Sequence, residues 1–202
     1  MTIPMLPFRI LVFLLSCVPF ALLVFNIVTG SLGPDPGQTV TETLGLSALQ
    51  LLIVTLLMTP LARWTQWTGW IKVRRMVGLF AFFYATLHLM AFLQFILGWT
   101  DLWATFTKRP YIIFGSIAFL LLIPLAVTST KSMMRRVGRR WKPLHRLIYP
   151  AVALAWLHFM FQARSDIAEM VIYGLVVVFL LGIRGYWFGW YSLIPLRAPR
   201  RS

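Results

Sequence analysis

The sequence contains three histidines, His88, His145 and His158, and each lies in or at the edge of a long apolar stretch. An ionisable side chain inside a membrane is costly, so it indicates a functional role by default, such as metal ligation or proton transfer. Such a histidine can also serve packing alone, through a hydrogen bond to a neighbouring helix. No acidic residue lies near them in the sequence, which argues against a hydrolytic or carboxylate-rich metal site.

Six apolar stretches must position these histidines. Crossing a hydrocarbon core of about 30 Å takes about 20 helical residues, and each stretch approaches or exceeds that length. Backbone groups in lipid must be satisfied internally, and these stretches lack the alternation of barrel strands, so helices are expected. We therefore predict an all-α integral membrane protein, a six-helix transmembrane bundle formed by a single domain over residues 1–202. The predicted spans are residues 8–29, 43–62, 76–97, 111–128, 143–161 and 168–188.

The composition supports this class of fold. Of 202 residues, 59% are hydrophobic and only 12% are charged, with a mean hydropathy of +0.80. A soluble domain is about half apolar and about a quarter charged. The single cysteine, Cys17, has no partner, so disulfide, zinc–thiolate and iron–sulfur chemistry are not expected.

The net charge of +14 does not indicate nucleic-acid binding, because the basic residues lie in short loops between the apolar stretches. Cytoplasmic loops of membrane proteins carry such an excess of lysine and arginine. The loop over residues 131–142 is the most basic, and the acids fall in the alternate loops or at their edges. We therefore predict that both termini are cytoplasmic.

Depth in the membrane brings two of the histidines together. His88 is 12 residues into the outward-running third span and His158 is 15 residues into the outward-running fifth, which at about 1.5 Å per residue is about 18 and 22 Å. Two imidazoles at one level on different helices can occupy both axial positions of a haem iron. We therefore expect haem between the third and fifth spans, with His88 and His158 as axial ligands.

His145 lies at the inner edge of the fifth span, about 20 Å along the helix from His158. This separation suits a second redox centre nearer the cytoplasm. Thirteen residues of straight helix turn through about 220°, so the two histidines would not share a face unless Pro150 changes the phase. The sequence holds no fourth histidine, so a haem at His145 needs another ligand, an open position or a shared arrangement.

Two other classes of function fit a six-span chain with intramembrane histidines. One is a transporter whose histidines relay protons. This class is disfavoured because the sequence lacks membrane-embedded acids and clear repeats with paired broken helices. The other is a cofactor-free membrane anchor whose histidines only pack. The basic loop over residues 131–142 fits a determinant of topology, and also a site for a flavin phosphate, a soluble reductase or anionic lipid.

Several short motifs, in this order along most of the chain, resemble the MsrQ (YedZ) family, the haem-binding membrane subunit of the bacterial periplasmic methionine sulfoxide reductase system. That family belongs to the ferric-reductase-like transmembrane superfamily, which includes the NADPH oxidases. The motifs are Leu32-Gly-Pro-Asp-Pro36, Thr59-Pro-Leu-Ala-Arg63, Arg74-Arg-Met-Val-Gly-Leu-Phe80, Ala85-Thr-Leu-His88, Lys108-Arg-Pro-Tyr111, Thr128-Ser-Thr130, Gly138-Arg-Arg-Trp141 and Leu144-His145. The chain departs from the oxidases in the third span, where His88 stands alone and the oxidases carry two histidines.

The resemblance implies a b-type cytochrome of the bacterial inner membrane that has no substrate-reducing site of its own. It would accept electrons at the cytoplasmic side, from the quinone pool or a flavin reductase, and pass them to a periplasmic molybdopterin-dependent methionine sulfoxide reductase. The implied cofactors are one or two haems b and FMN. Carried over by motif, His88 and His158 would ligate the outer haem iron and His145 an inner one.

Overall fold

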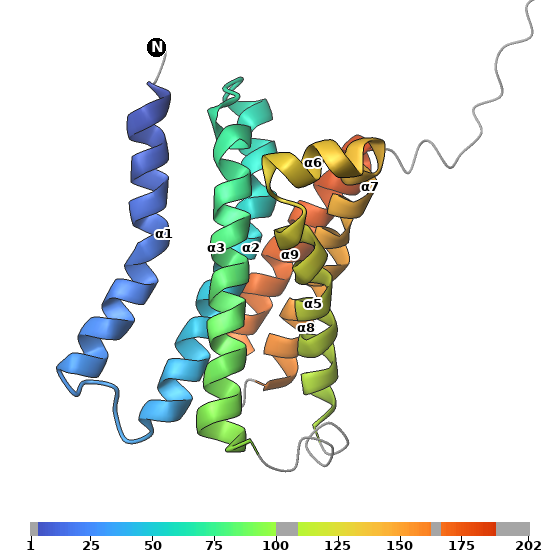
Figure 1. The fold of residues 1–202 in the computed structure, drawn as a ribbon. Helices are drawn as coiled ribbons and strands as arrows, with labels where there is room; N and C mark the ends of the chain where they lie inside the picture. The colour runs from blue at the N-terminus through green and yellow to red at the C-terminus, as the bar shows by residue number, and fades with distance from the viewer. Residues whose placement is uncertain (1–3, 100–108, 163–166, 189–202) are drawn as a thin grey trace, which may run out of the picture.

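The computed structural model describes residues 4–99, 109–162 and 167–188, and every regular element within these ranges is a helix. The long helices run alternately up and down the bundle (Figure 1). Five are long and apolar enough to cross a membrane, and a sixth apolar helix over Tyr111–Val127 is shorter. The six predicted spans are therefore all present, and the chain is a multi-pass membrane protein.

The bounds of the elements differ from the predicted spans mainly where polar residues extend a helix beyond the apolar stretch. α2 and α3 each begin seven residues before the predicted span. The helices are α1 (Met5–Val28), α2 (Pro36–Trp64), α3 (Gly69–Ala91), the π-helical turn η1 (Phe92–Leu97), α5 (Pro110–Val127), α6 (Lys131–Val137), η2 (Gly138–Arg140), α7 (Trp141–Leu144), η3 (His145–Leu147), α8 (Ile148–Gln162) and α9 (Ile167–Phe188).

The start of α2 shows why the helix is longer than its apolar part. Asp35 caps it, with its carboxylate accepting the backbone N–H of Gln38 at 3.0 Å, and Pro36 occupies the first helical position. Both features are typical of helix N-termini. The helix therefore forms from Pro36 onward, although residues 36–42 are mostly polar.

The fifth predicted span is not one continuous α-helix. A 3₁₀ turn over His145–Leu147 separates the short helix α7 from α8, which begins at Ile148. Pro143 and Pro150 cannot donate backbone hydrogen bonds, so the chain around His145 has fewer α-helical bonds available. His145 consequently precedes α8, and Pro150 lies in the first turn of that helix, where proline is tolerated.

The core of the bundle lies where α2, α3, α5, α8 and α9 meet. Its fully buried members include the small residues Ala81 and Ala151, both 0% exposed, which allow close helix approach. α1 stands to one side and packs mainly on α2 and α3, and most of its large apolar side chains are exposed, as lipid contact requires.

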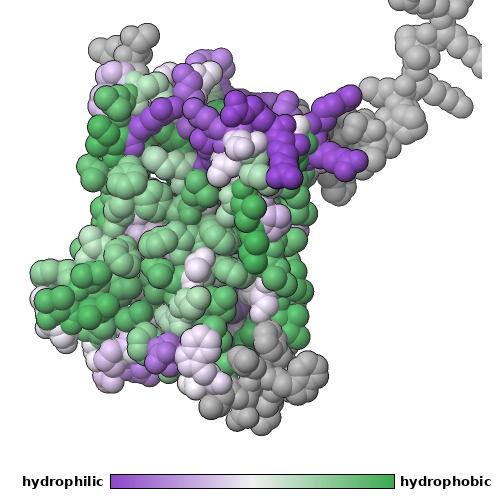
Figure 2. Space-filling view, viewed as in Figure 1, coloured by the Kyte–Doolittle hydropathy of each residue, from purple (hydrophilic) through white to green (hydrophobic). Residues whose placement is uncertain are grey.

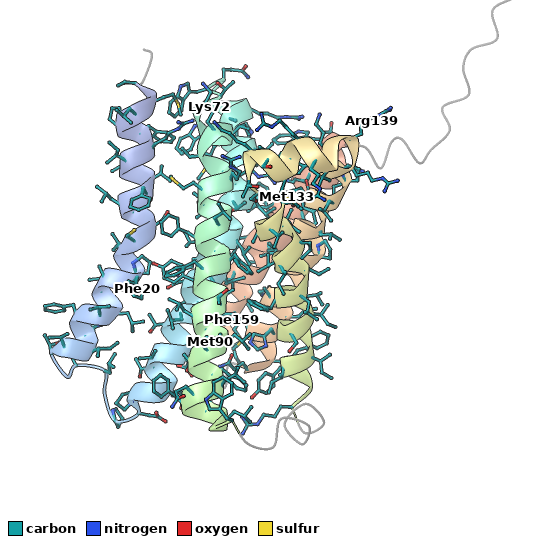
Figure 3. The ribbon with its side chains drawn as sticks, viewed as in Figure 1. Phe20, Lys72, Met90, Met133, Arg139 and Phe159 are labelled. Carbon is teal, nitrogen blue, oxygen red and sulfur yellow. The ribbon has the colours of Figure 1, made fainter. Side chains whose placement is uncertain are left out.

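Most of the described cationic side chains gather at one end of the bundle, which we call the basic end. It is formed by the C-terminus of α2, the N-terminus of α3 and the short helices from α6 to η3, with Lys72 and Arg139 among its exposed residues (Figure 3). Figure 2 shows this end as a hydrophilic band above a predominantly apolar belt. The described acids Asp35, Glu42 and Glu169 lie toward the opposite ends of α2 and α9.

Candidate functional site

His88 lies in the last turn of α3 and is held by the first turns of α2. Its Nδ1 is 2.8 Å from the backbone oxygen of Thr41. A carbonyl oxygen only accepts, so Nδ1 carries the proton and donates. The lone pair of the histidine is then on Nε2, which is the state that binds a metal.

Gly45 makes this contact possible. A Cβ atom at Gly45 would lie 2.8 Å from Nδ1 and 2.9 Å from Cε1 of His88. No real Cβ contact is that short, so the imidazole occupies space that only a glycine leaves open. The His88 ring therefore packs directly on the backbone of α2.

His158, on α8, repeats this arrangement against α5. Its Nδ1 is 2.8 Å from the backbone oxygen of Tyr111, so here too Nδ1 donates and Nε2 keeps the lone pair. A Cβ atom at Gly115 would lie 2.8 Å from Nδ1 of His158. Each histidine thus has a carbonyl and a glycine, four residues apart, on the neighbouring helix.

The two imidazoles face each other across the bundle. Their ring centroids are 6.0 Å apart and the ring planes are inclined at 74°. Two imidazoles on opposite sides of one metal ion, each bound at about 2.0 Å, have centroids about 6 Å apart. The sequence-based expectation placed these two histidines at one depth, and the structure brings their rings close together.

The pair lies away from the basic end, because His88 is in the last turn of α3 and His158 is near the end of α8. In Figure 3, Met90 and Phe159 lie at similar levels, in the half of the bundle away from Lys72 and Arg139. The candidate pair therefore belongs to the outer half of the membrane if the basic end is cytoplasmic.

The two halves of the site are related by an internal repeat. Thr41 and His88 are 47 residues apart, and so are Tyr111 and His158. A single step of 70 residues therefore maps the α2–α3 hairpin onto the α5–α8 pair, and it also relates the buried alanines Ala81 and Ala151. The α2–α3 and α5–α8 pairs are the two most extensive helix contacts of the bundle.

His145 is in a different environment, at the basic end. Its Nε2 is 3.0 Å from Oγ1 of Thr128, and the Thr128 hydroxyl donates its proton to the backbone oxygen of Pro124 at 2.6 Å. A hydroxyl has one proton, so Nε2 of His145 must donate, and the lone pair is on Nδ1. The ring of Trp141 lies against this imidazole, with the centroids 4.0 Å apart. The structure does not bring His145 to the other two histidines.

His145 lines a cavity of about 1460 Å³ that extends from the basic end into the bundle, between α3, α5, α8 and α9. We call it the inner cavity. Its deep wall is apolar and includes Phe82, Leu122 and Leu181. Its polar wall contains His145 and five cationic side chains, and no Asp or Glu is among the described residues that line the cavity. These cations are Arg74, Arg75, Lys142, Arg146 and Arg184.

Sequence reasoning missed three of the features that build these sites. Gly45 and Gly115 could have been found from their equal spacing to His88 and His158. Arg184 could have been found as an arginine within the apolar stretch of the sixth span. Thr128 was noticed only as part of a motif, and its contact with His145 is a property of the fold.

Some residues that the sequence-based predictions include fall outside the described residues. They are charged residues in the loop between the third and fourth spans and in the loop between the fifth and sixth: Asp101, Lys108, Arg164 and Asp166.

Comparison with known proteins matches most of this chain to one family of membrane proteins. Residues 44–156 match the family described as ferric reductase like transmembrane component. The chain is also 42% identical over 198 residues to the protein-methionine-sulfoxide reductase haem-binding subunit MsrQ of Rhodospirillum rubrum, across 96% of this chain and 91% of that protein.

Proposed function

The chain belongs to the MsrQ family of ferric-reductase-like transmembrane proteins, and on that premise we propose that it is a b-type cytochrome of the bacterial inner membrane. It passes electrons from the cytoplasmic side to a periplasmic molybdopterin-dependent methionine sulfoxide reductase. The observation that carries the proposal is the facing pair of His88 and His158, with ring centroids 6.0 Å apart.

The residues of this pair fit a haem with two axial histidines. Both imidazoles carry their proton on Nδ1 and keep Nε2 for iron. Their Nδ1–H···O bonds fix the ring orientation and increase the basicity of the ligating nitrogen. Gly45 and Gly115 leave the space in which the two rings are seated. When bound, the haem supplies the one-electron chemistry, while these residues bind, orient and tune it.

The inner cavity is the proposed point of electron entry. Its apolar wall and cationic rim suit a large amphiphilic anion. A second haem ligated by His145, or FMN, has this character, and family resemblance supports both. At His145 the free lone pair is on Nδ1, so ligation through Nε2 requires release of the Thr128 hydrogen bond. Quinone or a flavin reductase is the proposed donor at this end.

The proposed orientation rests on charge. The basic end carries the cations of the inner loops, and membrane proteins keep such loops in the cytoplasm. The His88–His158 pair then lies toward the periplasm, where the partner enzyme would accept the electrons. The net direction of transfer is from the cationic cavity outward.

A visible absorption spectrum of the purified full-length protein tests the proposal. We expect a Soret band and, after reduction, α and β bands, with one or two haems per chain by pyridine haemochrome. A proton-relay transporter and a cofactor-free anchor both predict no such bands. Protein purified from haem-replete cells without a Soret band would contradict the cytochrome assignment.

A further inference from the structure

Arg184, on α9, is the most deeply buried cation of the described chain, with 4% of its surface exposed. Its Nη1 donates to the hydroxyl of Tyr149 at 2.9 Å and its Nη2 donates to the backbone oxygen of Leu56 at 2.7 Å. Its Nε–H is buried and has no partner among the described residues. The side chain also lines the inner cavity.

One of these contacts has a structural explanation in α2. A helical carbonyl normally accepts from the N–H four residues later, and the residue four after Leu56 is Pro60, which has no N–H. Arg184 satisfies the carbonyl that Pro60 leaves without a donor. A neutral donor would do the same, so this contact does not explain why the side chain is a cation.

The charge of Arg184 has no counter-ion within the described chain. Its two partners, a phenol and a carbonyl, are neutral. Glu169, on the same helix, is 15 residues away, or about 22 Å, and Asp35 and Glu42 lie near the far end of α2. Arg74 adds a second positive charge close enough to interact with Arg184. A buried charge without a partner is strongly unfavourable, and this favours an anionic group beside it.

We propose that Arg184, assisted by Arg74, binds an oxyanion of the cofactor in the inner cavity. The group is a carboxylate of a haem propionate or the phosphate of FMN, which share the planar or clustered oxygen acceptors that a guanidinium binds. This inference deepens the proposed function and rests on it, because it requires a cofactor in the inner cavity. A neutral quinone would leave the charge of Arg184 unmatched.

Paired ligands that differ only in the oxyanion test the proposal. The full-length protein is titrated with FMN and with riboflavin, which lacks the phosphate. The His158→Ala variant, which removes the outer site, is titrated with haem b and with its dimethyl ester, which lacks the free carboxylates. We expect the protein with Arg184 unchanged to bind the anionic member of one pair at least about tenfold more tightly than the neutral member. The pair that shows this preference identifies the source of the oxyanion.

Arg184→Gln should abolish the preference, while the exposed control Arg136→Gln on α6 should keep it. Arg184→Lys keeps the charge without the planar fork, so it should retain the preference and bind the anionic member more weakly. Gln can still donate to Leu56, so the Tm of the ligand-free protein should fall little in Arg184→Gln. A purely structural role predicts the opposite: a lower Tm and equal loss for both members of each pair.

The outcomes separate two failures. Three results would overturn the role of Arg184. The wild type could bind a cofactor without preferring the anionic member, Arg184→Gln could keep the preference unchanged, or Arg184→Lys could keep the wild-type affinity for the anionic member. Binding of neither haem nor flavin in the inner cavity would instead overturn the proposed cofactor there, and the premise of the inference with it.

Discussion

A histidine binds a metal only through a nitrogen that keeps its lone pair, so the hydrogen bond on the other ring nitrogen determines what it can ligate. His88 and His158 both use Nδ1 for a backbone carbonyl and keep Nε2. His145 uses Nε2 for Thr128. The three histidines are therefore not equivalent, and only His88 and His158 leave the same ring nitrogen, Nε2, without a hydrogen bond to the protein.

The two glycines should matter as much as the histidines that they seat. Gly45→Ala and Gly115→Ala each place a Cβ atom 2.8 Å from an imidazole nitrogen, so the ring must move away from its carbonyl. We expect each variant to lose or strongly perturb the low-spin haem signal in electron paramagnetic resonance spectra.

Gly182→Ala is the control for the histidine pair, because Gly182 lines the inner cavity and not that pair, and a Cβ atom there meets nothing within 4 Å. It should leave that signal unchanged and add about 1 kcal/mol of helix propensity. Wild-type spectra in both Gly45→Ala and Gly115→Ala would show that close packing on the helix backbone does not position the imidazoles.

At the scale of the helix, proline positions explain contacts that hydropathy does not show. α1 changes direction near its middle in Figure 1, where Pro19 interrupts it. The hydroxyl of Tyr84, on α3, occupies the gap: it donates to the backbone oxygen of Ser16 at 2.8 Å and accepts from the N–H of Phe20 at 3.1 Å. In a straight helix these two groups would bond to each other, but in the bent α1 the hydroxyl bridges them, so Tyr84 joins α1 to α3.

Tyr84→Phe should therefore lower the free energy of unfolding by about 1–3 kcal/mol, because it leaves a backbone donor and an acceptor unsatisfied in an apolar environment. Thermal unfolding in detergent micelles would measure the change. Tyr173→Phe is the control, since it loses only the bond to the exposed side chain of Gln50 at 2.7 Å and should cost less. Equal losses in the two variants would argue against a role of Tyr84 in holding α1.

The sequence predicts the existence of the helices well because lipid requires long apolar segments. It predicts the residues at which the helices begin and end, and the contacts of the site, less well. The extra turns at the start of α2 and α3 lie in polar sequence, so hydropathy does not detect them, although Asp35 and Pro36 are a recognisable N-terminal signal. The tautomers of the histidines depend on carbonyls 47 residues away in the chain, and no local pattern specifies such a contact.

At the scale of the whole molecule, the separation of charge and histidines gives the bundle a direction. Cations line the polar wall of the inner cavity at the basic end, and the histidine pair lies toward the opposite ends of α3 and α8. The 70-residue step places one histidine on the α2–α3 pair and the other on the α5–α8 pair. An electron path from the cavity to the pair would thus run along the shared core of the five packed helices.

The orientation predicts the behaviour of reporter fusions. A fluorescent protein fused after Ser202 should be fluorescent and alkaline phosphatase at the same position inactive, because the cationic loops hold this end of the chain in the cytoplasm. Phosphatase inserted between α1 and α2, at Gly33, should be active. The reverse pattern would place the histidine pair in the cytoplasmic half and contradict the proposed direction of electron transfer.

The most direct test of the central claim is the electron paramagnetic resonance spectrum of purified His88→Ala and His158→Ala proteins beside the wild type. If one haem iron is held by both imidazoles, each single variant should lose the same low-spin bis-histidine signal, and the loss in the double variant should be no greater. A full bis-histidine signal in either single variant would show that these two histidines do not share an iron.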